Sequence, residues 1–285
     1  MTPRDTETAA PLPPPRKSLG QVFLASGRVI HRIVAALGHG PDDVVVEIGP
    51  GRGALTRELV GTCRRLLLVE KDDVLAAMHR DRHADDPSVA VVHGDATALD
   101  LADVLAPGER ARVVGNLPYN VGGQILFNLL RRRDRIDRMV LMFQREVAQR
   151  LAARPGDRNY GAASALVQLR AAVRPLFDVS PERFHPRPKV WSAVIEVVPL
   201  PPDPARDAVV DAPGFERLVH ALHAQPRKTV ANSLADGLRA DKGRCEAWLR
   251  AAGIDPGARP ATVPAAACLA LFAATQAAPD VPRDS

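Results

Sequence analysis

Five short apolar runs, separated by segments rich in helix formers, constrain the fold of this chain more than any other feature. The runs are VVVEI (44–48), LLLVE (66–70), VAVVH (89–93), RVVGN (112–116) and MVLMF (139–143). Runs of this length that are rich in Val and Leu and lack polar alternation are typical of strands buried on both faces of a parallel sheet. The segments between them, such as ALTRELVG and DVLAAMHR, predict helices with one polar face. We therefore predict repeated βαβ units in a doubly wound α/β sheet.

The pattern of strands and helices changes after about residue 160. GAASALVQLRAAV (161–173) predicts a helix, and KVWSAVIEVVP (189–199) alternates like a strand with one solvated face, which we expect to extend the sheet in the antiparallel direction. PLPPDPARD (199–207) is a Pro-rich break and the candidate linker. Four short helices are then predicted, the third ending at Gly253, over FERLVHALHAQ, TVANSLADGL, RCEAWLRAAG and VPAAACLALFAAT.

Composition narrows the class of protein. With 285 residues, 46% hydrophobic and 25% charged, the chain has ordinary globular values and can hold two modest domains. A net charge of +5 suggests an anionic partner such as nucleic acid, although a solvated surface also shows such an excess. Cys63, Cys245 and Cys268 have neither a disulfide framework nor metal-ligand spacing, so we expect reduced, packed thiols in a cytoplasmic protein. No signal peptide is visible, and no apolar stretch approaches the roughly 18 residues of a membrane span.

Chemistry-bearing residues follow the strands in order. The first strand runs into EIGPGRGALT, which places Gly49, Gly51 and Gly53 in a strand-to-helix turn where the backbone can approach a ligand closely. Glu70 ends the second strand about 20 residues later, where a carboxylate can accept both hydroxyl protons of a ribose. Asp95, after the third strand, is placed to receive the amine of an adenine ring. Each acid alone suits a solvated strand end or a helix cap, but in this order the three signals favour an adenosine site.

The GNLPYN stretch (115–120) bears on which reaction the adenosine site would serve. Asn and Pro are common turn formers, and Tyr is often a packing residue, so a structural role is one interpretation. The other is that the Asn116 side-chain oxygen and the Leu117 carbonyl accept the two N–H bonds of an adenine amine and free its lone pair for attack. Pro118 would stiffen the loop, Tyr119 would stack on the base, and Phe184 in RFHPRPKV is the candidate second ring. The GxGxG turn and the lack of a hydride-transfer His or Arg favour a methyl donor over NAD.

Together these motifs resemble the small-subunit ribosomal RNA adenine N6,N6-dimethyltransferases, relatives of the macrolide-resistance methylases that act on large-subunit RNA. The resemblance covers about residues 16–275 and rests on RKSLGQVFL, EIGPGRGALT, VEKDD, HGDA, GNLPYN, FQREVAQRLAARPGDRNYGAASALVQ, FHPRPKV, AQPRKTVANSL and AAGIDPGARP. It implies a doubly wound, mostly parallel seven-stranded methyltransferase sheet with a small C-terminal α-helical domain. On this chain we expect a flexible lead-in (1–15), a methyltransferase domain (16–200), a helical RNA-binding domain (208–276) and a flexible tail (277–285).

The resemblance also implies the cofactor and the site. S-adenosylmethionine would be the methyl donor, with no metal. The donor-binding residues would be Gln21, Leu24, Gly49, Gly51, Glu70, Lys71, Asp95, Ala96 and Asn116, and the acceptor site would be Asn116, Leu117, Pro118 and Tyr119 with Phe184. Gln21 and Leu24 would close over the methionine end, Glu70 would bind ribose and Asp95 adenine. Two positions depart from the family: Val22 stands where Asn is usual, and Trp191 where Asp is usual.

The implied activity is N6,N6-dimethylation of two adjacent adenosines in a hairpin loop near the 3′ end of 16S ribosomal RNA. We expect a monomer that acts in the cytoplasm on a partly assembled 30S particle, away from membranes. Two alternatives stay open, a non-catalytic assembly checkpoint and a large-subunit methylase that confers macrolide resistance. Basic residues that fit an RNA track are Arg131, Arg132, Arg133, Arg135, Arg138, Arg227 and Lys228.

Overall fold

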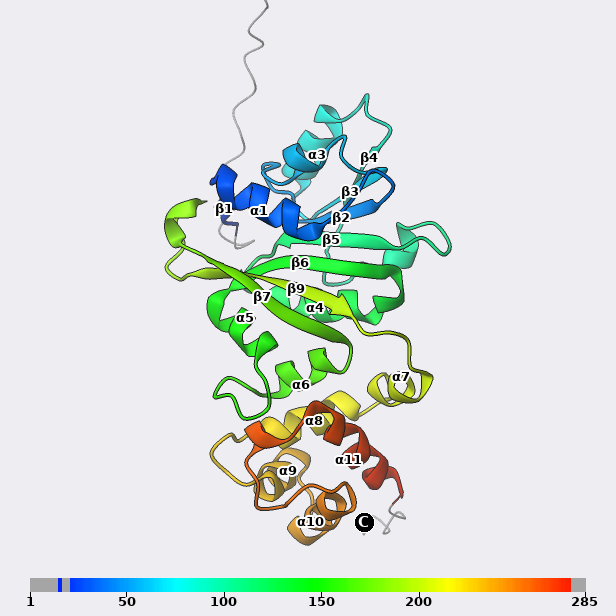
Figure 1. The fold of residues 1–285 in the computed structure, drawn as a ribbon, viewed down its shortest axis with the longest axis vertical. Coiled ribbons are helices and arrows are strands. Elements are labelled where there is room, and N and C mark those ends of the chain that lie inside the picture. Colours follow the sequence, from blue (N-terminus) through cyan, green and yellow to red (C-terminus); the bar gives the residue numbers. More distant parts are fainter. Residues whose placement is uncertain (1–14, 17–20, 278–285) are drawn as a thin grey trace, which may run out of the picture.

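The structure, a computed structural model, describes residues 15–16 and 21–277. Its centre is a seven-stranded sheet with the strand order β4-β3-β2-β5-β6-β9-β7 (Figure 1). The five predicted apolar runs form parallel strands β2 (Val44–Ile48), β3 (Arg65–Glu70), β4 (Val89–His93), β5 (Ala111–Asn116) and β6 (Ile136–Gln144). Strand β9 (Ser192–Pro199) is antiparallel to both β6 and β7 (Ala171–Val179). The predicted doubly wound, mostly parallel sheet is confirmed.

Helices cover both faces of this sheet because successive side chains of each strand point to opposite sides. In β2, Val44 and Val46 belong to the core under α4 (Gly122–Arg131) and α5 (Arg145–Ala152). Val45 belongs instead to the core under α1 (Gly27–Leu37) and α2 (Thr56–Leu59). Helix α3 (Asp73–Arg82) packs beside β3 and β4. Burial on both faces explains why these strands lack polar alternation.

The N-terminal segment returns to the edge of the sheet through a small second sheet. Strand β1 (Phe23–Leu24) pairs antiparallel with β8 (Phe184–His185), with Leu24 opposite Phe184. Single-turn helices η2 (Leu101–Asp103), η3 (Arg133–Arg135) and η4 (Pro181–Arg183) complete the connections. The β1–β8 pair holds residues 21–24 over the carboxyl end of the sheet.

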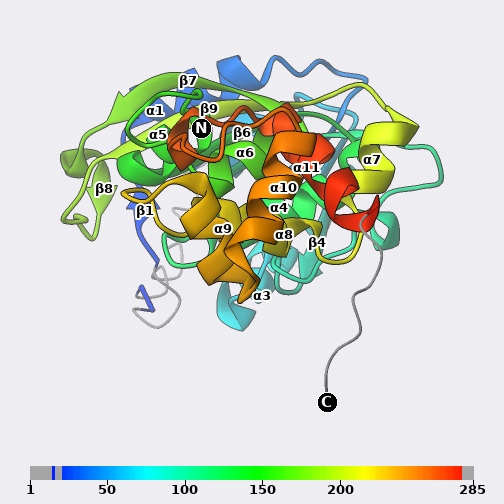
Figure 2. The same ribbon diagram turned by 90° about the horizontal axis from the view of Figure 1, so that it is seen from below.

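A helical unit follows the sheet and lies at its β7 side (Figures 1 and 2). It contains α7 (Pro204–Val210), α8 (Phe215–His223), α9 (Val230–Leu238), α10 (Lys242–Ala251), η5 (Pro260–Thr262) and α11 (Ala265–Ala277). The four predicted helices correspond to α8 to α11, and Gly253 follows α10 with a φ of +72°. Their core also includes residues of α6 (Ala162–Gln168) and the preceding loop, so the helical unit packs directly on the large one.

One sequence prediction at this junction was wrong. The helix predicted over 161–173 ends as α6 at Gln168, and the chain from Ala171 pairs with β9 as strand β7. Short Ala- and Val-rich runs do not distinguish a helix from a strand, and tertiary pairing decided this one. The Pro-rich segment leads from the end of β9 into helix α7, where Asp203 accepts hydrogen bonds from the backbone N–H groups of Ala205 and Arg206. Pro204 occupies the first helical turn, where its missing N–H costs nothing.

The remaining expectations concern the ends of the chain and the cysteines. The predicted flexible lead-in and tail lie outside the described residues, except for Pro15 and Ala277. All three cysteines are free and buried, as predicted. None of the helices within residues 21–277 is long and apolar enough to cross a membrane.

Candidate active site

The glycine turn after β2 brings the backbone next to the N-terminal segment. Gly51 has a φ of +57°, and a Cβ there would lie 3.0 Å from the ring of Phe23. Its N–H donates to Glu70 Oε2 at 3.0 Å, which ties the turn to the end of β3. Because only glycine combines this conformation with this contact at low cost, the turn requires the residue that the sequence supplies.

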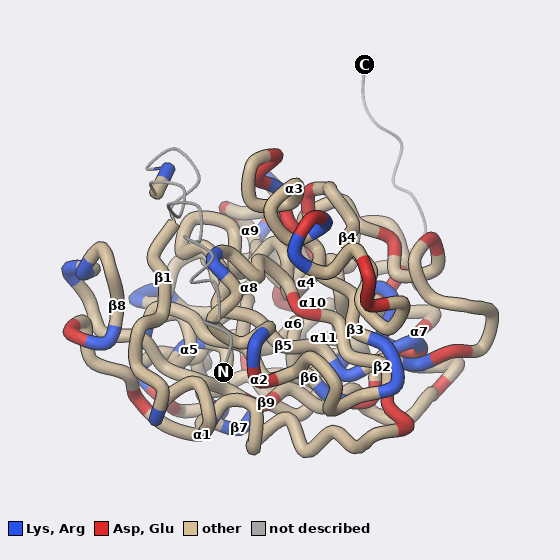
Figure 3. Tube along the Cα trace, turned by 90° about the horizontal axis from the view of Figure 1, so that it is seen from above, with Lys and Arg blue, Asp and Glu red and all other residues tan. Residues whose placement is uncertain are grey.

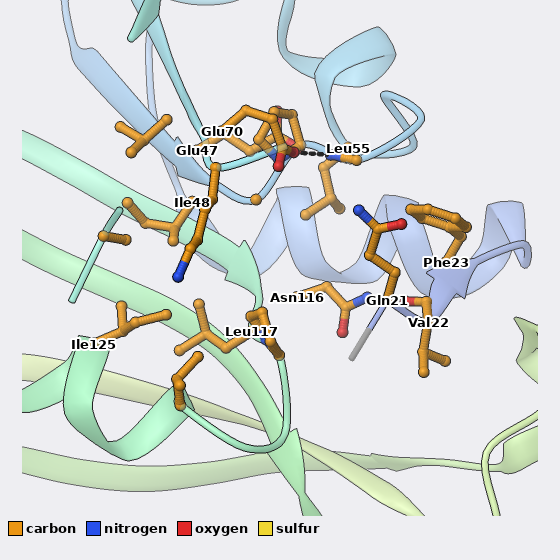
Figure 4. Close-up of a pocket in the computed structure, with 18 of the residues that line it drawn as sticks. Gln21, Val22, Phe23, Glu47, Ile48, Leu55, Glu70, Asn116, Leu117 and Ile125 are labelled. Atoms are coloured by element: carbon orange, nitrogen blue, oxygen red, sulfur yellow. Dashed lines mark hydrogen bonds between the residues drawn. The ribbon is translucent and has the colours of Figure 1, made fainter. Parts of the chain in front are cut away.

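Two buried carboxylates stand side by side at the ends of β2 and β3 (Figure 4). Glu47 is 1% exposed and Glu70 is 6% exposed. Thr56 Oγ1 donates to Glu47 Oε2 at 2.8 Å, and the N–H of Asp72 donates to Glu70 Oε1 at 2.9 Å. Burial raises the pKa of Glu47 to about 8 and also raises the pKa of Glu70. No basic side chain of the described residues forms an ion pair with either carboxylate, so this pair favours a cationic ligand.

A third carboxylate lies after β4 and is held in its charged form. Lys71 Nζ lies 2.6 Å from Asp95 Oδ2, and the N–H and hydroxyl of Thr97 both donate to Asp95 Oδ1. The hydrogen bond from Lys71 is the main reason that the pKa of Asp95 falls to about 2. Ala96, 7% exposed, forms the floor beside it. Asp95 therefore offers an ionised acceptor at the mouth of the cavity.

The GNLPYN stretch closes the opposite wall. Gly115 lets β5 approach β2, since a Cβ there would lie 2.7 Å from the Ile48 carbonyl oxygen. Asn116 Nδ2 donates to the Val22 carbonyl at 2.8 Å. The Leu117 side chain is buried in the core, while its backbone carbonyl receives no hydrogen bond from a described residue. The Asn116 side-chain oxygen and the Leu117 carbonyl are thus both available to a ligand.

The loop that follows is fixed by its own backbone and by one side chain. The N–H groups of Val121 and Gly122 donate to the Pro118 carbonyl at 3.2 and 2.9 Å. The Tyr119 hydroxyl lies 2.7 Å from Ser192 Oγ at the start of β9. Tyr119 is half-buried, so one part of its ring is anchored while another faces the cavity.

The N-terminal segment covers this site. Gln21 Nε2 donates to Asp72 Oδ2 at 2.9 Å, and Gln21 Oε1 accepts from the N–H of Arg16 at 2.8 Å. Arg16 Nε lies 3.3 Å from the same Asp72 carboxylate. Figure 4 shows Gln21, Val22 and Phe23 on the side of Asn116 away from Ile125. Residues 17–20 of the RKSLGQVFL motif lie outside the described residues.

One cavity collects nearly all the predicted site residues. Its lining includes Gln21, Leu24, Gly49, Gly51, Glu70, Lys71, Asp95, Ala96, Asn116, Leu117, Pro118 and Tyr119. Phe184 does not line it, because its ring is 5% exposed and packed in the core under α1. Sequence reasoning missed Glu47, whose place just before the glycine turn was the available signal, and also Phe23 and Ile125.

The basic stretch 131–138 lies elsewhere, so it does not border this cavity. Ala111 at the start of β5 pairs with Ile136 at the start of β6. The stretch therefore lies at the amino ends of these parallel strands, whereas Asn116 lies at the carboxyl end of β5. Most of its charge is neutralised: Arg132 pairs with Asp100, Arg133 with Asp207 and Asp211, and Arg138 with Glu196, while Arg135 donates to backbone carbonyls. Lys228 pairs with Asp236. Four of the seven residues of the track predicted from sequence are thus paired with carboxylates, whereas Arg131, Arg135 and Arg227 form no ion pair within the described residues.

Comparison with known proteins gives a consistent result. The family model described as "Ribosomal RNA adenine dimethylase" matches residues 14–276. Proteins called "Ribosomal RNA small subunit methyltransferase A" from Geobacter metallireducens and Methylococcus capsulatus are 44% and 45% identical, over 87% and 86% of this chain and 90% and 91% of theirs.

Solved structures show the same fold. The 23S rRNA methyltransferase ErmE is 28% identical with a TM-score of 0.63, over 89% of this chain and 99% of its own. A dimethyladenosine transferase from Plasmodium falciparum is 22% identical with a TM-score of 0.72, over 87% of this chain and 95% of its own. Within the described residues, no group of three or more His, Cys, Asp or Glu side chains is arranged to hold a metal ion.

Proposed function

The chain belongs to the ribosomal RNA adenine dimethylase family and is an rRNA methyltransferase, and from this premise we propose a specific reaction for it. The reaction is N6,N6-dimethylation of two adjacent adenosines in a hairpin loop near the 3′ end of 16S ribosomal RNA, with S-adenosylmethionine as donor. The substrate is a partly assembled 30S particle in the cytoplasm, and the enzyme acts as a monomer. The observation that carries the proposal is the meeting of Glu47, Glu70 and Asn116 in one cavity.

The cavity residues fit the proposed donor. S-adenosylmethionine carries a methyl group already activated on a positively charged sulfur, and its amino acid end carries an ammonium. Two desolvated carboxylates without a basic partner among the described residues fit this cation, because its positive charge favours the ionised form of Glu47, whose pKa is about 8 without it. In our assignment Glu70 binds the ribose hydroxyls, and Asp95 accepts from the adenine amine. Gln21 and Leu24 cover the methionine end, and Lys71 and Ala96 border the adenine.

The acceptor wall fits an adenine amine. The two N–H bonds of N6 need two acceptors, and the Asn116 side-chain oxygen and the Leu117 carbonyl are two consecutive acceptors with no donor from the described residues. Accepting both hydrogens pulls the nitrogen toward a tetrahedral shape and makes its lone pair available for in-line attack. Tyr119 would stack on the extruded base, a contact worth roughly 1–3 kcal/mol. Phe184 could join it only if the η4–β8 segment moved, because its ring is buried.

The two alternative functions receive less support. The checkpoint hypothesis drew on Val22, but it is the backbone carbonyl of residue 22 that contacts Asn116, and Val keeps that carbonyl. The large-subunit hypothesis would follow ErmE, whose identity of 28% is well below the 44% of a relative named for the small subunit.

A labelling experiment tests the proposal. The full-length protein is incubated with tritium-labelled S-adenosylmethionine and small subunits from a strain that lacks this modification, and large subunits serve as the control. We expect label on two adjacent adenosines of one 16S hairpin loop, identified as N6,N6-dimethyladenosine by nuclease digestion and mass spectrometry. Label on large subunits, or no label from protein that binds the donor in calorimetry, would reject it.

A further inference from the structure

A second, shallow groove lies on the α1 side of the catalytic cavity and has a composition suited to RNA. Its lining includes Ser26, which precedes α1, and Arg28 and Arg32 in the first half of that helix. Asp178 at the end of β7, Arg183 and Trp191 complete the charged and aromatic part of the lining. Figure 3 shows Lys and Arg positions, interspersed with acidic ones, around β8, which directly follows Arg183 of the groove. The lining thus combines several cations with one large aromatic ring.

Trp191 is unusually placed for so large an apolar side chain. It is 44% exposed, and among the described residues it is the one aromatic ring in the group of exposed large hydrophobic side chains. Its backbone is held in place, since the N–H of Arg145 donates to the Trp191 carbonyl at 2.9 Å. The Arg145 guanidinium lies 5.4 Å from the ring centroid and 3.7 Å from Asp178. A fixed, exposed ring of this kind is a platform on which a base can stack.

The charge of the groove is available for an anion. Arg28, Arg32 and Arg183 are exposed and form no ion pair within the described residues. The guanidinium of Arg32 lies 3.7 Å from the centroid of the Phe177 ring, which holds it in the groove. The acid of the groove, Asp178, already faces Arg145. This contrasts with Arg132, Arg133 and Arg138, which are neutralised by carboxylates at the other edge of the sheet.

Residues that are adjacent in sequence connect the groove to the acceptor wall. Trp191 precedes Ser192, whose hydroxyl contacts the Tyr119 hydroxyl at 2.7 Å. Leu24 lines the catalytic cavity, and Ser26, two residues later, lines the groove. The N–H of Ala25 between them donates to the Arg183 carbonyl at 2.8 Å. The same short segments of the chain therefore build part of the acceptor wall and part of the groove.

We propose that this groove binds the unpaired nucleotides next to the target adenosines, with one base stacked on Trp191 and the adjoining phosphates on Arg28 and Arg183. The proposal rests on the proposed function, because it takes the substrate to be RNA held at Asn116. It gives this chain a substrate contact at Trp191, one of the two positions where we expect a departure from the family.

Kinetics of the full-length protein on undermethylated small subunits test the stacking contact. We expect Trp191→Ala to raise KM about tenfold, as loss of one base stack predicts, with kcat and donor affinity unchanged. Trp191→Phe, which keeps a ring, should recover most of the loss. A KM that Trp191→Ala leaves unchanged, or that Phe does not rescue, would overturn the proposal.

The arginines are tested by the dependence of KM on salt. Arg28→Ala and Arg183→Ala should each lower the slope of log KM against log salt by about 0.7, the value for one phosphate contact of a single strand. Arg131→Ala is the matched control, because it removes an exposed arginine at the opposite edge of the sheet. If Arg131→Ala lowered the slope equally, the arginines of the groove would contribute no more to RNA binding than other surface arginines, which would contradict the proposal.

A fluorescence titration separates this proposal from the proposed function. The chain has two tryptophans, so Trp248→Phe leaves Trp191 as the only tryptophan, whose emission is excited selectively above the absorption of tyrosine. A hairpin RNA whose loop carries two adjacent adenosines should quench this emission with the same midpoint as its anisotropy change. Binding without quenching contradicts the groove but leaves the methylation reaction intact, whereas quenching by RNA that is never methylated contradicts the reaction alone.

Discussion

The side-chain amide of Asn116 donates a hydrogen bond to the backbone carbonyl of Val22, with 2.8 Å between Nδ2 and O. This contact joins the end of β5 to the N-terminal segment that covers the cavity. A carbonyl can only accept, so the amide must direct its nitrogen to Val22 and keep Oδ1 free. The contact therefore orients the oxygen that we propose accepts a hydrogen from adenine N6.

Asn116→Asp should abolish most methylation while leaving the protein folded. A carboxylate has the size of the amide but cannot donate to the Val22 carbonyl, and it would repel that oxygen instead. We expect the single-turnover rate to fall by about 100-fold or more, the usual cost of a misplaced group that stabilises the transition state. Rapid-quench measurement with saturating donor gives this rate.

Asn120→Asp provides the control, because it adds the same charge to the lining of the same cavity, at an exposed residue whose side chain makes no hydrogen bond to a described residue. Its rate should stay within a few-fold of the wild type. Similar losses in both variants would mean that the added charge, and not the amide orientation, is responsible.

Donor binding should depend on pH through Glu47. Burial raises the pKa of Glu47 to about 8, so the free enzyme carries a proton there at pH 6. A cationic donor favours the ionised form, so its affinity should rise with pH by up to about tenfold per unit and level off above pH 8. Glu47→Gln should flatten this profile and bind the donor more weakly at pH 8.5. Calorimetry at several pH values, in buffers of different ionisation enthalpy, measures both the affinity and the proton release.

The raised pKa of Glu47 should also affect how the stability of the donor-free protein depends on pH. Because the folded-state pKa of Glu47 lies above the ordinary value of 4.5, its contribution to stability is complete below pH 4.5 and is lost as the pH rises through 8. The melting temperature of Glu47→Gln relative to wild type should therefore increase between pH 5 and pH 8.5. A constant difference across this range would refute the buried, protonated state of Glu47.

Two substitutions of Tyr119 should distinguish a packing role of this residue from stacking on the target base. Tyr119→Phe removes the hydroxyl that contacts Ser192 Oγ at 2.7 Å and leaves a fully buried serine without that partner. We expect a loss of about 1–2 kcal/mol in the free energy of unfolding, with KM for RNA nearly unchanged. Tyr119→Ala also removes the ring and should raise KM for RNA by about tenfold or more. Urea denaturation and steady-state kinetics give the two quantities, and an equal KM for the Phe and Ala variants would exclude stacking.

Sequence alone predicted the sheet well because its strands are buried on both faces and carry a simple signal. The runs at 44–48 and 89–93 match β2 and β4 in their bounds, and Glu70 and Asn116 end their strands as expected. The order of parallel strands then places all three carboxyl ends at one edge, so the convergence of Gly51, Glu70 and Asn116 follows from topology.

What the sequence could not supply depends on contacts between distant segments. Strand β7 is defined by pairing with β9, whose residues lie on the other side of η4 and β8. The burial of Phe184 follows from the pairing of β8 with β1, which the sequence around either strand does not predict. Likewise, the pairing of Arg133 with Asp207 and Asp211 joins residues more than 70 positions apart. A count of arginines in the sequence cannot reveal which charges are already neutralised.

His223 should make the helical unit sensitive to acid. It is buried in α8, its ring meets Tyr160 edge-on at 5.7 Å, and neither ring nitrogen has a hydrogen-bond partner among the described residues. Burial is the main reason that its pKa falls to about 4 from an ordinary value of 6.5. Since the folded-state pKa is the lower one, the stability is present above pH 6.5 and is lost as the pH falls toward 4, by up to about 3 kcal/mol.

His223→Leu removes the group that must be charged when the chain unfolds in acid. The variant should lose less stability than the wild type between pH 6.5 and pH 4, and comparison at each pH cancels the opposite contribution of Glu47. His31→Leu, the same change at an exposed position of α1, should keep the wild-type pH dependence. Urea denaturation at each pH provides the free energies. Parallel curves for the wild type and His223→Leu would show that the junction between α8 and Tyr160 does not control acid unfolding.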